Sequence, residues 1–292
     1  MTNYNHFTEC LITGKKDLYP LKGYEKDYLV KSKSSSFVFS SKIPSQKEIL
    51  DVYKNYPVGY NTDSPINNTR VSELLESFER FRRTNKILDV GCGPGLFLIE
   101  AKKRGWEVFG TEFTDEQITY LNDKGIQTYQ GKLSPTSFEK ESFDIIISSE
   151  VIEHINNPME EMSLFNSFLR KGGITYITTP NFNAIERFLL KGKYNIIHYP
   201  EHLCYYTPKT INLLLEKCGF EKIITTTTGT SFTRIKNSLS NKEQTYVDNL
   251  DNDSTLRTSL ESGYKSYLKT FANYLLNYFK IGNSLKAWYI KL

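Results

Sequence analysis

The sequence ILDVGCGPGLF, from Ile87 to Phe97, decides the fold of this 292-residue chain. An apolar, β-rich run ends at Asp89-Val90, three glycines follow at alternate positions, and a helical pattern begins at Gly95. Glycine lets the backbone turn sharply and approach a ligand closely, and the start of a helix presents unpaired amides. The stretch therefore predicts a buried strand, a ligand-binding turn and a crossover helix.

Short β-rich runs alternate with segments of helical periodicity along the rest of the chain. This alternation is typical of parallel strands joined by crossover helices, so we expect a doubly wound α/β fold with a seven-stranded, Rossmann-like sheet. Because the last strand follows a long detour, we expect it to run antiparallel beside the sixth. The expected strands are Lys86–Val90, Glu107–Thr111, Gln127–Gln130, Phe143–Ser148, Ile174–Thr179, Lys222–Thr228 and Ser284–Lys291. The expected crossover helices are Gly95–Arg104, Asp115–Asp123, Pro158–Leu169 and Pro208–Cys218.

The sequence divides into four parts. Residues 1–65 lack the alternation and form an appendage with a linker helix from about Ser45. Residues 66–233 form the core, introduced by a helix over Ile66–Arg83, and residues 281–292 supply its final strand. Residues 234–280 form a helical insertion with one apolar face, which we expect to pack on the core; a homodimer or a membrane surface is the alternative. That face comprises Tyr264, Leu268, Phe271, Leu275 and Tyr278.

Composition narrows the classes of partner. The net charge is only +4, and the Lys and Arg residues are scattered, so a nucleic-acid partner is not expected. The N-terminus lacks an apolar leader, and no run is long enough to span a membrane, which favours a cytoplasmic protein. The four cysteines show neither metal-knuckle nor redox-pair spacing, so we expect unpaired thiols.

The glycine-rich turn carries features that favour one kind of ligand. Leu96 stands where a nicotinamide-binding fold would have its third glycine, and Pro94 lacks an amide for a pyrophosphate. Asp89 suits a ligand that carries an ammonium group. Glu112 stands at the end of the next strand, where its carboxylate offers two acceptor oxygens, and Phe113 follows it.

The stretch from Asp89 to Gly95 resembles motif I of class I S-adenosylmethionine-dependent methyltransferases. The resemblance implies S-adenosyl-L-methionine as the cofactor, with the acid of the motif at its methionine end and Glu112 on its ribose. Lys132 departs from the family pattern, which often has an acid there that binds the adenine amino group. The implied cofactor-binding residues are Asp89, Gly91, Cys92, Gly93, Gly95, Glu112, Phe113, Leu133 and Ser149.

A second cluster follows the fourth strand. Glu150, Glu153 and His154 would share one face of a helical turn at the carboxyl end of the sheet, where open α/β sheets bind ligands. The segment resembles the E-x-x-E-H element of methyltransferases of the ubiquinone pathway and of those that modify the 2′-hydroxyl of small RNAs. The resemblance implies Mg²⁺ held by these three residues, with His202 of Pro200-Glu201-His202-Leu203 as a further ligand.

The same four residues, Glu150, Glu153, His154 and His202, are the predicted catalytic group. With a metal they would lower the pKa of an acceptor hydroxyl; without one, His154 or His202 would be the general base. The alternative is that Glu153 and His154 only tie loops together.

The aromatic-rich segment from residue 181 to residue 206 interrupts the fold at the edge where lids commonly form. We expect Asn181, Tyr199, His202 and Tyr206 to lie near the acceptor. For the Tyr and Phe residues of this segment, ordinary packing is the equal alternative.

The N-terminal sequence resembles the small zinc ribbon that precedes many methyltransferases of sugar and polysaccharide pathways. Cys10 occupies the first ligand position, but Thr13, Ser32 and Ser35 occupy the other three. One thiol cannot hold the ion, so we predict no zinc and a hairpin kept in shape by hydrogen bonds.

These patterns together predict O-methylation of a small hydroxylated acceptor, such as a sugar of a surface polysaccharide. A quinone-type or aromatic hydroxyl is the first alternative, and a 2′-hydroxyl of RNA is the third choice. Two rivals of other kinds are a cofactor-binding pseudoenzyme that serves a partner protein and a nicotinamide dehydrogenase.

Overall fold

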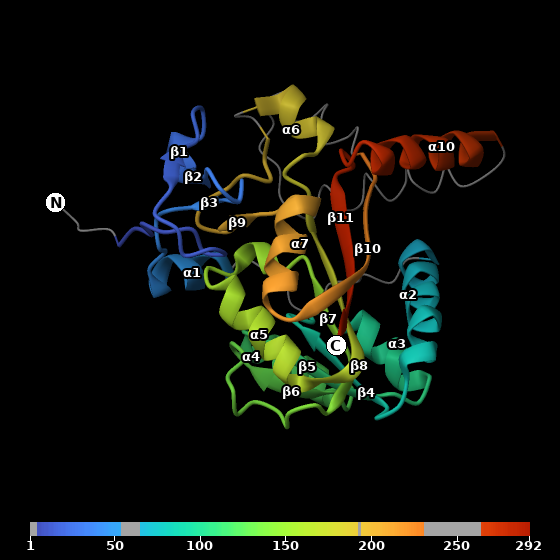
Figure 1. Ribbon diagram of the computed structural model, residues 1–292. Coiled ribbons are helices and arrows are strands. Elements are labelled where there is room, and N and C mark those ends of the chain that lie inside the picture. The colour runs from blue at the N-terminus through green and yellow to red at the C-terminus, as the bar shows by residue number, and fades with distance from the viewer. Residues whose placement is uncertain (1–4, 54–64, 192–193, 231–263) are drawn as a thin grey trace.

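A computed structural model gives the structure of the chain and describes residues 5–53, 65–191, 194–230 and 264–292 (Figure 1). Seven strands form the central sheet in the order β10-β11-β8-β7-β4-β5-β6. All seven expected strands are present, and β11 runs antiparallel between β10 and β8, as predicted. The strands are β4 Lys86–Val90, β5 Glu107–Glu112, β6 Gln127–Gln130, β7 Phe143–Ser149, β8 Leu169–Pro180, β10 Phe220–Thr228 and β11 Ser284–Lys291.

Strand β8 begins five residues earlier than the sequence predicts. Leu169 pairs with Phe143, and the register then shifts before Ile145 pairs with Ile174. The pair Gly172-Gly173 lies within this irregularity, and the strand continues through it.

Helices cover both faces of the sheet, and the central strands send alternate side chains to each face. Ile87 and Ile145 belong to the core under α2, α3 and α4, whereas Leu88 and Ile146 belong to the core under α5 and α7. All of these residues are fully buried. The helices are α2 Pro65–Phe78, α3 Leu96–Lys103, α4 Asp115–Asp123, α5 Pro158–Phe168 and α7 Pro208–Lys217.

The N-terminal region forms a second, smaller sheet, which also includes a strand from the C-terminal half of the chain. Its order is β1-β2-β3-β9, and β9, Cys204–Tyr205, pairs antiparallel with β3. Phe37 and Phe39 are completely buried and share the main core with Tyr206. The N-terminal region is therefore joined to the core through its aromatic side chains. The other strands are β1 Leu18–Pro20, β2 Leu29–Ser32 and β3 Val38–Ser40.

The four zinc-ribbon positions hold a hydrogen-bonded hairpin, as predicted. The Cys10 Sγ lies 3.4 Å from Ser35 Oγ, and the Ser35 amide donates to Ser32 Oγ at 3.2 Å. Burial disfavours the thiolate of Cys10, but hydrogen bonds from Ser35 and Thr13 outweigh burial and lower its pKa. All four cysteines of the chain are unpaired.

Helix α10, Tyr264–Tyr278, corrects the prediction for the insertion. The helix is present, but Phe271 and Tyr278 of its apolar face are 61% and 68% exposed instead of packed on the core. The opposite face meets edge strand β10, where Asn277 Oδ1 accepts from the Thr227 amide at 3.0 Å and Asn273 Oδ1 accepts from the Gly229 amide at 2.9 Å. Helix α10 is therefore oriented so that its polar side chains accept hydrogen bonds from amides that would otherwise be unpaired at the edge of the sheet. Residues 234–263 of the predicted insertion lie outside the described part.

Among the described residues, none of the helices has the length and apolar character that a membrane span requires.

Asp144 ties the amino edge of the sheet together and provides a stability test. Its buried carboxylate accepts from the amides of Arg83 and Asn85 at 2.7 and 2.8 Å and from the Arg170 Nε at 2.5 Å. Burial alone would raise the pKa of Asp144, but these donors lower it below its ordinary value of 3.8.

We expect Asp144→Asn to lower the free energy of unfolding by about 3 kcal/mol at neutral pH, because buried donors lose their charged acceptor. Since the folded-state pKa is depressed, this contribution is complete above the unfolded pKa and is lost as the pH falls through the folded pKa. Urea titrations should therefore show a difference that shrinks below about pH 4. Glu107→Gln, on an exposed side chain, is the control. A constant difference across this range would contradict the assignment.

Candidate active site

A pocket of about 800 Å³, measured to its open mouth, lies at the carboxyl ends of the parallel strands. This is the edge at which open α/β sheets bind ligands. Turns after β4, β5, β6 and β7 form its floor, and α5 forms one wall. Ile49 and Val52 of α1, Gln46–Tyr53, also contribute, so the N-terminal region lines the pocket. The lining residues are Ile49, Val52, Val90, Gly91, Thr111, Phe113, Gly131, Lys132, Leu133, Val151, His154, Ile155, Asn156, Asn157, Glu161, Pro200, Glu201 and Leu203.

The three glycines of the turn after β4, Gly91, Gly93 and Gly95, differ in the space around their Cα atoms. All three have left-handed backbones. A Cβ at Gly91 would lie 2.6 Å from Val151 Cγ2, and one at Gly95 would collide with Leu121 of α4. Gly93 faces open space instead. Packing therefore requires Gly91 and Gly95, while the surface at Gly93 stays free for a ligand.

Glu112 lies at the end of β5, directly beside the glycine-rich turn. Its Oε2 accepts from the Gly93 amide at 3.1 Å, and its Oε1 accepts from the Phe113 amide at 2.7 Å. Two amides thus hold the carboxylate at the end of the strand, where it is available to a ligand diol. Phe113 lines the pocket and is 38% exposed, so its ring is available to a base.

Asp89 is buried at the carboxyl end of β4. Burial, together with the negative charge of Glu112, raises its pKa to about 8. A cationic group bound beside this carboxylate would favour the ionised form.

The remaining predicted cofactor residues have different placements. Leu133 lines the pocket. Cys92 instead packs its side chain into the core against Gly110, where an added Cβ would lie 2.7 Å from the thiol. Its amide and carbonyl are bonded to Thr111 and Gly95. Ser149 is exposed at the end of β7 and is not among the lining residues.

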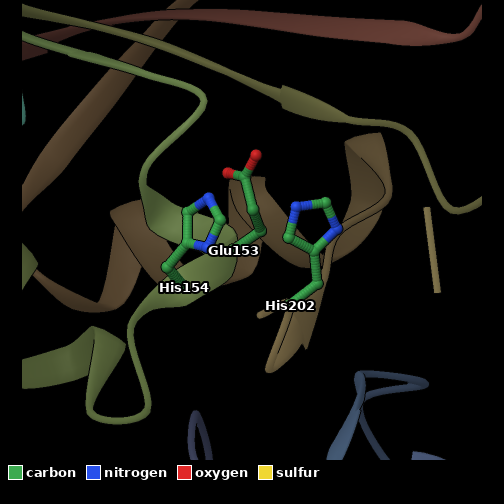
Figure 2. Close-up of side chains that lie close together, drawn as sticks. All are labelled: Glu153, His154 and His202. Atoms are coloured by element: carbon green, nitrogen blue, oxygen red, sulfur yellow. The ribbon is translucent and has the colours of Figure 1, made fainter. Parts of the chain in front are cut away.

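Three of the four predicted catalytic residues converge beside this pocket. Glu153 and His154 come from the short helix η3, Ile152–His154, and His202 comes from the segment before β9. Their ligand atoms all lie within 4.8 Å of one another, and the two imidazole rings meet edge to face. Figure 2 shows the carboxylate of Glu153 standing between the two rings.

Backbone carbonyls orient both imidazoles. His154 Nδ1 donates to the Glu201 carbonyl at 2.7 Å, and His202 Nδ1 donates to the Ile196 carbonyl at 2.6 Å. In the neutral rings each Nε2 therefore carries a free lone pair. Glu153 is nearly inaccessible and accepts one hydrogen bond, from Thr179 Oγ1 at 2.9 Å. This is the donor set and outer support that divalent metals find in proteins.

Burial sets the protonation preferences of the cluster. It raises the pKa of Glu153 well above its ordinary value, and the nearby charge of Glu150 adds to the effect. It lowers the pKa of His154, and it lowers that of His202 to about 3, helped by repulsion from His154. In the free protein all three groups are therefore driven toward their neutral forms.

Glu150 departs from the predicted arrangement. The short helix begins at Ile152, and Glu150 has a left-handed backbone with φ 55°, so it does not share a helical face with Glu153 and His154. Its carboxylate is exposed and stands outside the group of close ligand atoms.

The predicted acceptor residues are only partly brought together. Asn181 lies beside Glu153 and His202 on a narrow second cavity, but its side-chain nitrogen is bound to the carbonyls of Lys280 and Gly282. Tyr206 is completely buried against Phe37, so for this residue the structure shows the alternative of ordinary packing. Tyr199 contacts Tyr28 and the ammonium of Lys42 in the interface with the N-terminal region.

The sequence interpretation missed Ile49, Val52 and Glu161. Nothing local marks the first two, because they reach the pocket only through the tertiary fold. Glu161 carried a signal, since it lies on the buried side of α5 at helical spacing from Leu164 and Phe168.

The fold and the pocket define a doubly wound α/β protein that binds a nucleoside-containing cofactor at its glycine-rich turn. The sequence profile of the methyltransferase domain family matches residues 66–225, more than half of the chain. The chain therefore belongs to this family, and it is a class I S-adenosylmethionine-dependent methyltransferase.

Among curated proteins, the chain is 24% identical over 176 residues to the ubiquinone biosynthesis O-methyltransferase of Ruegeria sp. (strain TM1040), with coverage of 52% of this chain and 69% of the relative. It is 37% identical over 114 residues to the mitochondrial ubiquinone biosynthesis O-methyltransferase of Rattus norvegicus, covering 36% of this chain and 33% of that protein. The chain thus spans about a third of the rat relative.

Solved structures share the fold. A SAM-dependent methyltransferase from Archaeoglobus fulgidus has a TM-score of 0.52 and 18% identity, covering 77% of this chain and 94% of its own. Phosphoethanolamine N-methyltransferase 2 of Haemonchus contortus, solved with S-adenosyl-L-methionine, has a TM-score of 0.56 and 18% identity, covering 87% of this chain and 61% of its own.

Glu112 provides a direct test of where the cofactor binds. We expect Glu112→Ala to weaken the binding of S-adenosylhomocysteine roughly 10- to 100-fold in calorimetry, because two hydroxyls lose a charged acceptor. Glu107→Ala, at the other end of the same strand, should bind like the wild type. Unchanged affinity in Glu112→Ala would show that the ribose lies elsewhere.

Asp89 provides a pH test. Because its pKa in the free protein is raised to about 8, a proton must leave before the carboxylate can hold the cofactor ammonium. Affinity for S-adenosylhomocysteine should therefore rise between about pH 6 and 8, by at most about tenfold per pH unit, and then level off. Asp89→Asn should bind more weakly and lose this dependence. A wild-type affinity that is constant over this range would argue against an ionised Asp89 in the complex.

Proposed function

We propose that this protein transfers the methyl group of S-adenosylmethionine to a hydroxyl oxygen of a small acceptor. The observation that carries the proposal is the cluster of Glu153, His154 and His202, whose free Nε2 atoms and buried carboxyl face one another beside the cofactor pocket. Transfer to a hydroxyl requires removal of a proton, and these groups offer two routes for that step.

We place the cofactor across the carboxyl ends of β4 and β5. Asp89 would orient the methionine end, the open surface at Gly93 would receive the backbone of the ligand, and Glu112 would hold the ribose. Phe113 and Leu133, which both line the pocket, would contact the base. The open side of Gly93 and the two-oxygen reach of Glu112 support this placement.

The cluster offers ligands for a divalent cation. The sequence resemblance implies Mg²⁺, which prefers oxygen donors, so Glu153 would be its principal ligand. Two imidazoles oriented through Nδ1, together with a carboxylate oriented by Thr179, supply three ligands. Glu150 is our candidate for a further ligand, because its charge already reaches Glu153. Such an ion would lower the pKa of the acceptor hydroxyl. Glu153, His154 and His202 would orient the acceptor and keep water away from the oxygen that attacks the methyl group.

His154 is the better general base if no metal takes part. It lines the cofactor pocket, and the hydrogen bond that its ring donates to the Glu201 carbonyl, together with the charge of Glu201, opposes the lowering of its pKa by burial. His202 has its pKa lowered to about 3, which leaves it a weak base near neutral pH. Its fixed ring is better suited to holding the acceptor or an ion.

For the acceptor we propose a sugar or another small polar hydroxyl compound. The zinc-ribbon-like hairpin, which resembles those of polysaccharide-pathway methyltransferases, supports this choice, and so do the polar side chains of Asn156 and Asn157 on the pocket wall. The second candidate is an aromatic or quinone-type hydroxyl, supported by the ubiquinone O-methyltransferase relatives.

The two acceptor classes are separated by assaying S-adenosylhomocysteine formation with nucleotide-linked sugars and with catechols. Turnover with one set identifies the class. Cofactor binding without turnover on either set or on a hydroxylated cell extract would support the pseudoenzyme alternative and contradict the proposal.

The metal proposal is tested with His202→Gln. We expect the wild type to bind about one Mn²⁺ in calorimetry, and the variant to lose more than the roughly 10- to 100-fold that removal of an outer partner costs. His6→Gln changes a histidine hydrogen-bonded to Ser41, far along the chain from the cluster, and should leave Mn²⁺ binding intact. Methyl transfer that resists exhaustive chelation would exclude the metal route and favour His154 as the base.

A further inference from the structure

Glu161 is a buried acid on an otherwise apolar face of α5. Leu164 and Phe168 follow it at helical spacing, and the Phe168 ring packs on Phe138 with centroids 5.7 Å apart. Phe138 therefore packs on this face, and residues 131–133 line the same pocket as Glu161. Glu161 occupies the turn of the helix nearest to the pocket and is only 7% exposed.

The carboxyl group of Glu161 has no bonded partner within the part of the chain that the structure describes, although it lines the pocket. Neither oxygen is among the fully enclosed polar atoms that lack partners, so the remaining exposure of the group is to the pocket. Burial raises the pKa of Glu161 to about 7, and Lys132 opposes this by attraction without forming an ion pair within 4.0 Å. An apolar helix face rarely carries an unpaired acid unless a ligand completes it.

The position of Glu161 matches one end of the cofactor. A ligand that runs from Asp89 past Glu112 continues toward the end of the next strand, β6, where Gly131, Lys132 and Leu133 line the pocket. The base would lie there. Lys132 can only donate hydrogen bonds, so it offers no acceptor to an adenine amino group.

We propose that Glu161 recognises the amino edge of the adenine ring of the cofactor. As a carboxylate it accepts a hydrogen bond from the 6-amino group. As an acid it also donates to N1, which makes a two-bond pair with the same edge. Lys132 cannot accept a hydrogen bond from the adenine amino group, and Glu161 of α5 accepts it instead, from the other side of the base. This inference rests on the proposed placement of the cofactor.

The test compares two ligands, S-adenosylhomocysteine and the analogue in which purine replaces adenine and the 6-amino group is missing. We expect the wild type to prefer the adenine compound roughly 10- to 100-fold in calorimetry. In Glu161→Leu this preference should vanish, because the adenine compound weakens while the purine compound does not. Glu161→Gln should keep most of the preference, since its amide can both accept and donate.

Glu160→Leu, one residue earlier on the exposed side of α5, is the matched control and should keep the wild-type preference. Equal weakening of both ligands in Glu161→Leu, or an unchanged preference, would overturn the role of Glu161 while leaving the cofactor site in place. Failure of the wild type to bind either ligand would overturn the cofactor placement itself. The ratio of the two affinities is measured within each variant, so a general loss of stability does not imitate the expected result.

Discussion

The active site depends on the backbone of a single residue, Leu203, whose amide and carbonyl groups are both hydrogen-bonded to other parts of the chain. Its amide donates to the Glu153 carbonyl at 2.7 Å, and its carbonyl accepts from the Ser40 amide at 2.8 Å. The first bond places His202 beside Glu153, and the second anchors the same segment to the N-terminal sheet. Because buried backbone groups must be paired, the N-terminal region and the site residues have to assemble together.

Much of the fold follows from local sequence, whereas the site follows only in part. Buried strands such as Phe143–Ser149 are predicted by continuous apolar runs. The glycine-rich turn predicts at which edge of the sheet the cofactor binds. The pairing of β9 with β3 is different, because a two-residue strand has no periodicity and its partner lies more than 160 residues away. The resemblance to known ligand sets predicted that Glu153, His154 and His202 would lie together. Glu150 lies outside that group because of a left-handed backbone that the sequence does not specify.

The pocket and its surroundings concentrate acids in a low-dielectric space. Asp89, Glu153 and Glu161 all have raised pKa values because burial penalises their charged forms. Each can regain ionisation only if a positive or hydrogen-donating group arrives beside it. The proposed occupants supply such groups: an ammonium, a divalent cation and an exocyclic amine. In the free protein, burial therefore makes ionisation of these carboxyl groups unfavourable, and the ligands would remove that penalty. The affinity for each ligand then depends on the protonation state of the acid beside it.

The hairpin closed by Cys10, Ser32 and Ser35 has a consequence for how the protein is sustained in a cell. A ribbon built on four thiolates folds only when zinc is supplied and loses its shape when its thiols are oxidised. Here hydroxyl groups and one deeply buried thiol provide the same closure. The fold of the region that contributes α1 to the pocket therefore does not depend on four thiolates, which zinc shortage or oxidation would disable in a cysteine-rich ribbon.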